Sequence, residues 1–342
     1  MHVLGWDIGG ANLKVSDGQS RSLELPCPLW KESERLAETI AASQATFFER
    51  ADGWAITMTG ELADCFRTKR EGVRRILDSV KQAARGIPVG VWTTGGEFVS
   101  IDEAIDWPLL TAASNWLALA TWVGRMNPRG NAVLIDIGST TTDVIPLFDG
   151  FPDPVGRTDV ERLLSGELVY TGCRRTPVSA MASDVMFRGE RCPLAAELFA
   201  TVLDVHLLLG NLNESGDCET ANSGPASVEG AYDRLARMLC CDREEMTIDD
   251  ARAIAHELAE RQLETIGAAL GRVVERMRGQ CGAVIVSGSG EFLAQGALKR
   301  CGALHEAEVH SLGRALGPEH ATAACAFAVA RLAVERGVFQ EV

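Results

Sequence analysis

An Asp-Ile-Gly turn between two apolar stretches occurs twice in this chain, at residues 7–9 and 136–138. The first copy lies in LGWDIGGANLKV (4–15) and the second in LIDIGSTTTDV (134–144). Each copy reads as a strand, a tight turn and a second strand, because strand-forming residues flank a glycine that can bend the backbone. One such turn is most often an ordinary hairpin. Two copies, each opening one half of the chain, indicate a duplicated unit.

The two halves meet at the turn NPRGN (127–131), after which the strand–turn–strand pattern starts again. We therefore expect two lobes, residues 1–126 and residues 131–342, because single hydrophobic cores stop growing at about 250–300 residues. A loop-rich insertion at about 152–227 interrupts the second lobe. Strands alternate with helices in both halves, and this alternation predicts an α/β fold.

The glycines of both turns leave room for an anion to approach the main chain, since they carry no Cβ atom. Backbone N–H groups at the bend and the hydroxyl groups that follow it in the second copy can donate hydrogen bonds to that anion. The residues predicted to bind a diphosphate or a nucleotide in this way are Gly9, Gly10, Asn12, Gly138, Ser139, Thr140 and Thr141.

An aspartate precedes the glycine in each turn. Asp7 and Asp136 would repel a bound phosphate, so each is better placed to face a Mg²⁺ ion that the phosphates share. Mg²⁺ is commonly held by one or two carboxylates together with phosphate oxygens. Lys14 can add a positive charge beside the same anion. The sequence therefore predicts a site for magnesium and a phosphorylated ligand, with Asp7, Asp136 and Lys14 as the candidate catalytic residues.

A third glycine cluster, Gly288-Ser289-Gly290, lies between an apolar strand and a helix. A helix N-terminus suits a phosphorylated ligand, so these residues are candidates for binding a nucleotide. The cluster lacks the third glycine of the dinucleotide fingerprint. Whether ATP is a ligand of this chain is left open.

Composition excludes several classes of protein. The formal charge is −14 and the isoelectric point is about 5.0, so the chain lacks the basic footprint of nucleic-acid binding. The most apolar stretch, residues 109–124, is too short and too polar to span a bilayer and is predicted to form one buried helix. The ten cysteines are scattered, and the N-terminus does not resemble a signal peptide. A cytoplasmic protein without membrane or nucleic-acid partners is expected.

The strings DIGGANLK, DIGSTTTDV and VIVSGSGEF, together with an Ala-rich closing helix, resemble the actin, sugar kinase and Hsp70 superfamily. That resemblance implies an actin-like, ribonuclease H-like fold. Its two lobes would each hold a mixed sheet with flanking helices, and a cleft would lie between them. The two turns would be its phosphate-binding segments, and the third cluster its adenosine segment.

Four further strings narrow the resemblance to the hydantoinase/oxoprolinase A group, and within it to small proteins linked to tetrahydromethanopterin-dependent C1 transfer. The strings are MTGELAD (58–64), AASNWLALA (112–120), SGELVYTGCRRTPV (165–178) and ATVLDVHLLLGNLNESGDCETA (200–221). Members from methanogens are similar to an enzyme of methanofuran biosynthesis. It couples an aminomethyl-furanmethyl diphosphate to the phenol of a glutamyl-tyramine and releases diphosphate.

This resemblance implies roles for three more residues. Arg174 and Arg175 would bind the diphosphate or the glutamyl carboxylate of the acceptor, although paired arginines in a loop are often only solvated. Asp143 is the candidate base near the phenol. Its alternatives are a second carboxylate near the metal or a hairpin cap.

Other functions stay open at this point, since the superfamily hosts many activities. They are an ATP-dependent kinase or ATPase, a hydrolase of the hydantoinase/oxoprolinase type, and a non-catalytic nucleotide-binding assembly protein. The partners expected for the transferase are a small diphosphate substrate and a phenolic amine. A homo-oligomer is also compatible with the sequence.

Overall fold

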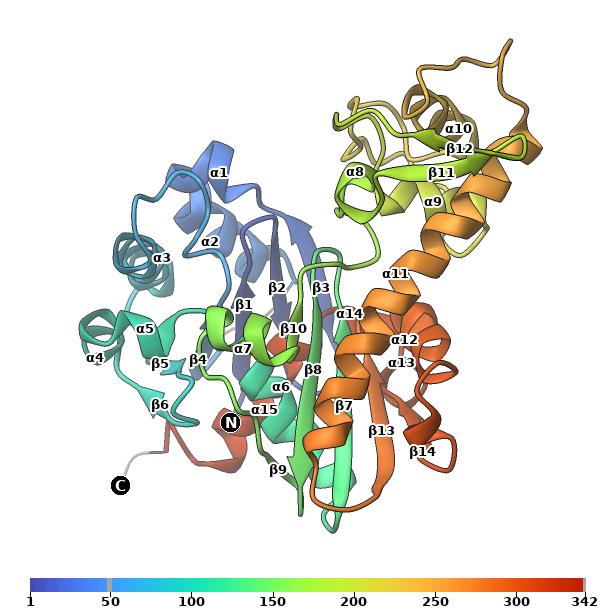
Figure 1. The fold of residues 1–342 in the computed structure, drawn as a ribbon. Coiled ribbons are helices and arrows are strands. Elements are labelled where there is room, and N and C mark those ends of the chain that lie inside the picture. The colour runs from blue at the N-terminus through green and yellow to red at the C-terminus, as the bar shows by residue number, and fades with distance from the viewer. Residues whose placement is uncertain (48–50, 341–342) are drawn as a thin grey trace.

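The computed structural model describes residues 1–47 and 51–340, and its two lobes are each built on a mixed sheet (Figure 1). The first sheet has the order β3-β2-β1-β4-β5-β6. Strand β2 is antiparallel to β1 and β3, whereas β4 runs parallel to β1 and β5. The strands are β1 (Val3–Ile8), β2 (Asn12–Ser16), β3 (Ser22–Pro26), β4 (Gly53–Met58), β5 (Val89–Trp92) and β6 (Phe98–Val99).

The second sheet repeats this arrangement in the order β10-β8-β7-β13-β14, with β9 paired to β8. Again an antiparallel hairpin, here β7–β8, is continued by parallel strands on its other side. This shared topology confirms the duplicated ribonuclease H-like fold. The strands are β7 (Asn131–Ile137), β8 (Thr142–Phe148), β9 (Phe151–Pro152), β10 (Leu168–Val169), β13 (Cys281–Ser287) and β14 (Glu308–Ser311).

Helices of the first lobe cover its sheet. Helix α3 illustrates why they form: Thr68 accepts a hydrogen bond from the Glu71 amide at its N-terminus, and a stripe of apolar residues faces the core. The helices are α1 (Leu29–Glu32), η1 (Ser33–Arg35), α2 (Leu36–Phe47), α3 (Lys69–Ala84), α4 (Ile101–Asp106) and α5 (Pro108–Thr111).

The prediction of one buried helix over residues 109–124 is wrong, because the segment breaks in two. Helix α5 ends at Thr111 and α6 (Asn115–Val123) begins after Ala113, whose φ is +47°. The hydroxyl of Ser114 bonds to the Trp92 carbonyl and to Thr57, and these bonds hold the break against the first sheet. Leu109, at the start of the stretch, is 65% exposed.

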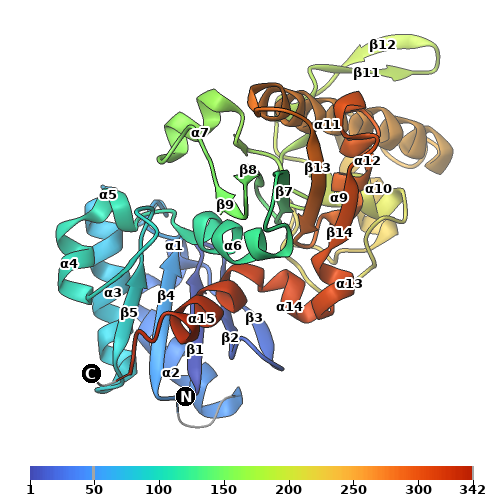
Figure 2. The same cartoon turned by 90° about the horizontal axis from the view of Figure 1, so that it is seen from below.

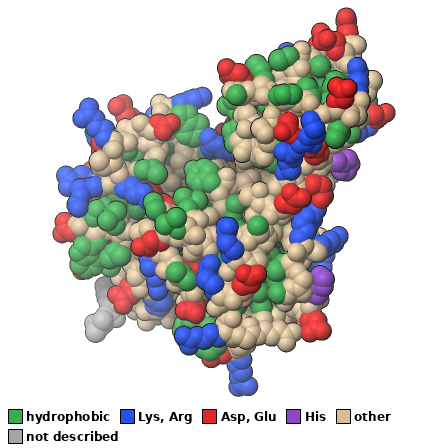
Figure 3. All heavy atoms as spheres, viewed as in Figure 1, with side chains coloured by type: hydrophobic (Ala, Val, Ile, Leu, Met, Phe, Trp, Pro, Cys, Tyr) green, Lys and Arg blue, Asp and Glu red, His purple; other side chains and the backbone are tan. Residues whose placement is uncertain are grey.

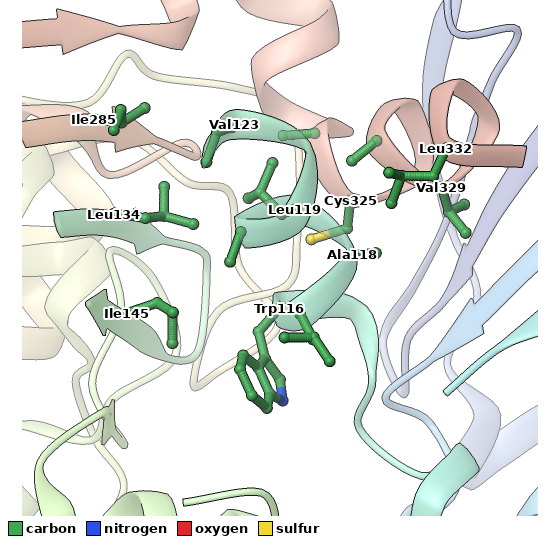
Figure 4. Packing of buried hydrophobic residues seen from close by; sticks show 14 of the residues in the cluster. Trp116, Ala118, Leu119, Val123, Leu134, Ile145, Ile285, Cys325, Val329 and Leu332 are labelled. Carbon is green, nitrogen blue, oxygen red and sulfur yellow. The ribbon is translucent and has the colours of Figure 1, made fainter. Parts of the chain in front are cut away.

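Two helices cross between the lobes (Figure 2). Helix α6 packs on α15 (Ala324–Glu335), and their shared cluster contains apolar side chains from both sheets (Figure 4). Although α15 follows the second sheet in sequence, it packs on β1. A Cβ atom at Gly5 would lie 2.0 Å from the Ala326 carbonyl oxygen. Glycine is therefore needed where the closing helix meets the first lobe.

A subdomain projects from the second lobe at the upper right of Figure 1. Its apolar core extends from Val178 to Ala259, so it starts and ends later than the predicted insertion at 152–227. Inside it, Arg234 forms a buried ion pair with Asp204. Its elements are α8 (Val178–Met181), β11 (Asp184–Phe187), β12 (Glu190–Pro193), α9 (Val202–Leu208), α10 (Val228–Arg237) and the first part of α11 (Ile248–Arg276).

The rest of α11 returns to the second sheet and packs on it. The remaining helices are η2 (Gly124–Met126), α7 (Asp159–Ser165), α12 (Glu291–Leu298), η3 (Gly302–Leu304), α13 (Leu312–Leu316) and α14 (Pro318–Thr322). Within residues 1–47 and 51–340, no helix combines the length and the apolar character that crossing a membrane requires. The ten cysteines are free thiols.

Candidate active site

The two Asp-Ile-Gly turns have the same local structure. In the first, the Gly9 amide donates to the Asn12 carbonyl over 3.0 Å; in the second, the Gly138 amide donates to the Thr141 carbonyl over 3.0 Å. The hairpin register pairs Asp7 with Lys14 and Asp136 with Asp143. Lys14 and Asp143 therefore occupy equivalent positions, so the duplication has placed opposite charges at the same site in the two lobes.

The strand beside each turn is also repeated. Asp7 is in register with Thr57 on β4, and Asp136 with Ser287 on β13. The chain then bends over the turn, where the Gly60 amide bonds to the Ile8 carbonyl over 3.0 Å. The Gly290 amide bonds to the Ile137 carbonyl in the same way over 2.9 Å.

These bends carry matching sequences, Thr59-Gly60-Glu61 and Ser289-Gly290-Glu291. Gly60 and Glu61 are not among the site residues predicted from the sequence. The repeat of Thr/Ser-Gly-Glu directly after β4 and again after β13 was the sequence signal that could have identified them.

The two turns face each other closely enough for their charges to interact. Burial raises the pKa of Asp7, and the Lys14 ammonium opposes that rise. Burial and the neighbouring Asp143 carboxylate raise the pKa of Asp136 to about 7. Lys14 opposes this rise, and Asp7 adds to it. Burial raises the pKa of the Cys325 thiol on α15 well above its ordinary value. The Asp7, Asp136 and Asp143 carboxylates add to this rise, and Lys14 opposes it. Acidic groups from both lobes thus converge over the closing helix.

Asp7 has room for a ligand. Its Oδ1 atom is buried without a hydrogen-bond partner, and Oδ2 has only the Asn115 side-chain amide, at 3.5 Å. No group of three or more His, Cys, Asp or Glu side chains in the described part of the chain is arranged to hold a metal ion. The unpartnered Asp7 oxygen, together with the Asp136 carboxylate that interacts with it, fits Mg²⁺ that arrives with a phosphorylated substrate, because Mg²⁺ then takes its other ligands from phosphate and water.

Lys14 is held near this pair by a third carboxylate. Its ammonium lies 3.8 Å from Glu24 on β3, and the Asn12 side chain donates to the same Glu24 oxygen over 2.8 Å. Burial alone would lower the pKa of Lys14, but the carboxylates of Glu24, Asp7 and Asp136 outweigh it and raise the pKa. Lys14 therefore carries its positive charge at neutral pH.

The loop that holds the two predicted arginines packs directly on the second turn. The amides of Arg174 and Arg175 both donate to the Ser139 carbonyl, over 3.0 and 2.9 Å. Gly172 makes this possible, since a Cβ atom there would lie 2.5 Å from the Gly138 carbonyl oxygen. The arginines predicted from sequence thus lie beside the predicted anion site.

The two arginines have different surroundings. Arg174 is paired with Asp217 of the subdomain. The guanidinium of Arg175 lies 5.0 Å from the ring of Trp30 on α1, which belongs to the first lobe. Among the described residues, no carboxylate is within ion-pair distance of Arg175. Arg175 is therefore the better placed of the two to bind a substrate anion. Figure 3 shows that the surface is hollowed between the first lobe and the subdomain.

Asp143, the base candidate, is already engaged by a cation. Arg162 on α7 donates to Asp143 over 2.6 Å and to the Glu167 carbonyl over 3.0 Å, and its guanidinium lies 4.0 Å from the Trp116 ring centroid. Burial raises the pKa of Asp143, while Arg162 lowers it. This pairing gives Asp143 a clear role in holding α7 against the sheet, which the sequence did not reveal. Its role as a base stays a prediction.

The third glycine cluster contacts the second turn from the neighbouring strand. A Cβ atom at Gly288 would lie 2.3 Å from the Ile137 carbonyl oxygen, and one at Gly290 would lie 2.4 Å from the Ile137 side chain. Ser289 contacts Cys173 of the arginine loop, with 3.2 Å between Oγ and Sγ. Close packing thus accounts for both glycines, and nucleotide binding by this cluster stays a prediction.

The Hydantoinase/oxoprolinase family model matches residues 52–336. This chain belongs to the hydantoinase/oxoprolinase family. Over 334 residues it is 34% identical to a protein of Methanocaldococcus jannaschii, covering 96% of this chain and 97% of that relative. That relative is named as the synthase of a furan-2-yl methanamine that carries a γ-glutamylaminoethyl-phenoxymethyl group.

A Methanococcus vannielii protein of the same name is 30% identical over 203 residues, covering 59% of this chain and 90% of that relative. Among solved structures, the Lmo2764 protein of Listeria monocytogenes, an N-acetylmannosamine kinase candidate, superposes with a TM-score of 0.51. Its identity is 13%, and the match covers 98% of this chain and all of that one. At that identity the likeness concerns the fold alone, which agrees with the repeated sheet topology.

Proposed function

We propose that this family member is a transferase that joins a furanmethyl diphosphate to a phenol and releases diphosphate. The observation that carries the proposal is that this chain is 34% identical, over 96% of its length, to a synthase whose product contains a phenoxymethyl-furan ether. Forming that ether from a phenol requires a leaving group on the furan methylene. Diphosphate, which the family resemblance implies, suits a site with two anion-binding turns.

The reaction balances without a redox partner. The phenolic O–H bond breaks and its proton passes to a base. The phenolic oxygen bonds to the furan methylene carbon, and the bond from that carbon to the diphosphate oxygen breaks. The electron pair leaves with the diphosphate. The backbone amides of both turns and the Lys14 ammonium would stabilise the charge that grows on the leaving oxygens. Asp7 and Asp136 would hold a Mg²⁺ ion, which supplies Lewis acidity to the same leaving group.

The acceptor would approach from the side of the arginine loop. The Arg175 guanidinium is exposed there, without a carboxylate of the described residues within ion-pair distance, and it lies 5.0 Å from the apolar ring of Trp30. A guanidinium binds a carboxylate well, so Arg175 would bind the glutamyl carboxylate of the acceptor. Placing the product in one-carbon carrier biosynthesis of the methanofuran type follows the family resemblance seen in the sequence.

The test is direct coupling. Purified protein is incubated with Mg²⁺, the aminomethyl-furanmethyl diphosphate and a glutamyl-tyramine, and both free diphosphate and the coupled ether are measured. The proposal predicts equal amounts of the two products without ATP. A product that forms only with ATP would support the kinase alternative, and tight nucleotide binding without turnover would support the assembly protein.

A matched pair of variants assigns the activity to the site. Asp136→Asn should abolish coupling, because Asp136 would help to hold the Mg²⁺ ion that binds the leaving group. Asp149→Asn is the control: Asp149 lies at the opposite end of β8, in the turn to β9, where its side chain accepts a bond from the Gly130 amide. That control should keep full activity.

A further inference from the structure

Glu61 is held rigidly at the edge of the first turn. It follows strand β4 and the bend at Gly60, whose amide is bonded to the Ile8 carbonyl. Helix α3 fixes its backbone from the other side, since a Cβ atom at Gly72 would lie 2.0 Å from the Glu61 carbonyl oxygen. The next residue, Leu62, is 63% exposed. Glu61 therefore lies where the chain emerges from the core beside the site.

The Glu61 carboxylate is buried but incompletely satisfied. The residue is 1% exposed, and its Oε2 atom has no hydrogen-bond partner. A buried polar atom without a partner costs free energy, and such atoms are rare unless they serve a function. The described part of the chain supplies no donor for this oxygen, so a substrate hydroxyl that enters beside Glu61 would give it the hydrogen bond that it lacks.

Its counterpart in the other lobe differs in this respect. Glu291 occupies the same place in the repeated bend, where its two oxygens accept from the Ser311 hydroxyl over 2.6 Å and the Gly313 amide over 2.8 Å. A third glutamate, Glu167, is fully buried and accepts from two backbone amides. Compared with these two structural glutamates, Glu61 alone keeps an open oxygen.

The charged groups that face Glu61 come from both lobes. Lys69 on α3 and Asp159 on α7 form an ion pair of 2.6 Å that connects the lobes next to it. Burial raises the pKa of Glu61 to about 7; Lys69 opposes that rise and Asp159 adds to it. General bases work best when their pKa lies near the working pH. The environment of Glu61 meets that condition.

A short segment links Glu61 to the first turn. The backbone amide of Ala113 donates a hydrogen bond to the Glu61 carboxylate and opposes the rise of its pKa. Two residues later, the Asn115 side chain reaches Asp7. The break between α5 and α6 therefore positions Glu61 and Asp7 from the same stretch of backbone, with Glu61 on the side that faces α7.

We propose that Glu61, rather than Asp143, is the catalytic residue that accepts the proton of the phenolic acceptor. This inference rests on the proposed function. In the reaction, the phenolic O–H bond breaks toward Oε2 of Glu61, the freed electron pair forms the bond to the furan methylene, and the diphosphate leaves with its own electron pair. Glu61 returns the proton to solvent after the ether has left.

The test varies the acidity of the acceptor. Coupling rates of wild type and Glu61→Gln are compared at about pH 8 for an ordinary phenol, whose pKa is about 10, and for a ring-fluorinated analogue that is already ionised. Glu61→Gln should lose about 100-fold or more with the ordinary phenol, in line with the usual contribution of a general base. It should regain most of the rate with the ionised analogue, and Glu61→Asp should show an intermediate loss.

A structural role would give another pattern. The matched control Glu291→Gln changes the equivalent glutamate and should retain the wild-type dependence on acceptor acidity. Equal losses for both phenols in Glu61→Gln, or no loss at all, would overturn the inference while leaving the proposed function intact. Absence of coupling by wild type would overturn the proposed function and this inference together.

Discussion

Replacing Glu61 by glutamine should stabilise the protein at alkaline pH, although it is expected to slow the reaction. The pKa of Glu61 is about 7 in the folded protein against an ordinary 4.5. The folded state therefore binds this proton more tightly than the unfolded state does. For a raised carboxyl pKa, stability falls as pH rises from about 4.5 to about 7 and then stays constant. Glutamine is neutral throughout and avoids that loss.

The size of the effect follows from the shift. Each pKa unit corresponds to about 1.4 kcal/mol, so the full cost of the Glu61 charge is about 3 kcal/mol above pH 7. At about pH 5.5 the same reasoning gives about 1 kcal/mol. The gain in unfolding free energy of Glu61→Gln should thus grow by about 2 kcal/mol between about pH 5.5 and about pH 8.5.

Urea unfolding followed by tryptophan fluorescence is the suitable assay. All seven tryptophans precede residue 123, so their emission reports on the lobe that contains Glu61. Glu167→Gln is the matched control: it removes an acceptor oxygen that a backbone amide uses, and should destabilise the protein at both pH values. A Glu61→Gln variant with no pH-dependent gain would refute the description of Glu61 as a buried, partly unsatisfied carboxylate.

Two further predictions concern the packing that builds the site. Gly5→Ala should destabilise the protein by about 1–3 kcal/mol or more, since the new methyl group would overlap the closing helix. Gly271→Ala on α11 has open space and should stabilise by up to about 1 kcal/mol; equal urea midpoints for the two would contradict this account. Arg162→Met should cost about 3–5 kcal/mol because it strands a buried Asp143 charge. Burial raises the pKa of Asp143, so this loss should grow with pH, and adding Asp143→Asn should recover most of it; no recovery in the double variant would count against the pairing.

The turns themselves were predictable because their signals are local. Apolar residues on both sides of Asp-Ile-Gly specify a strand, a bend and a strand wherever they occur, and repetition of the pattern identified the duplication. The link between the arginine loop and the second turn came only through family resemblance. Its physical cause, the contact of Gly172 with Gly138, joins segments that are distant in sequence.

What the sequence could not show depends on tertiary contacts. The unsatisfied oxygen of Glu61 and the pairing of Asp143 with Arg162 arise only when separate elements pack together. The break at Ala113 was missed because an apolar run gives no sign of the hydrogen bonds made by Ser114. The course of the closing helix back to the first sheet is likewise set by packing.

The central claim is that the two turns bind one magnesium–diphosphate unit together. Calorimetric titration of Mg²⁺-diphosphate into wild type, Asp7→Asn, Asp136→Asn and the double variant tests it most directly. The account predicts one bound diphosphate per chain, at least a tenfold loss of affinity in each single variant, and little further loss in the double variant. Undiminished affinity in either single variant, or two independent sites per chain, would contradict it.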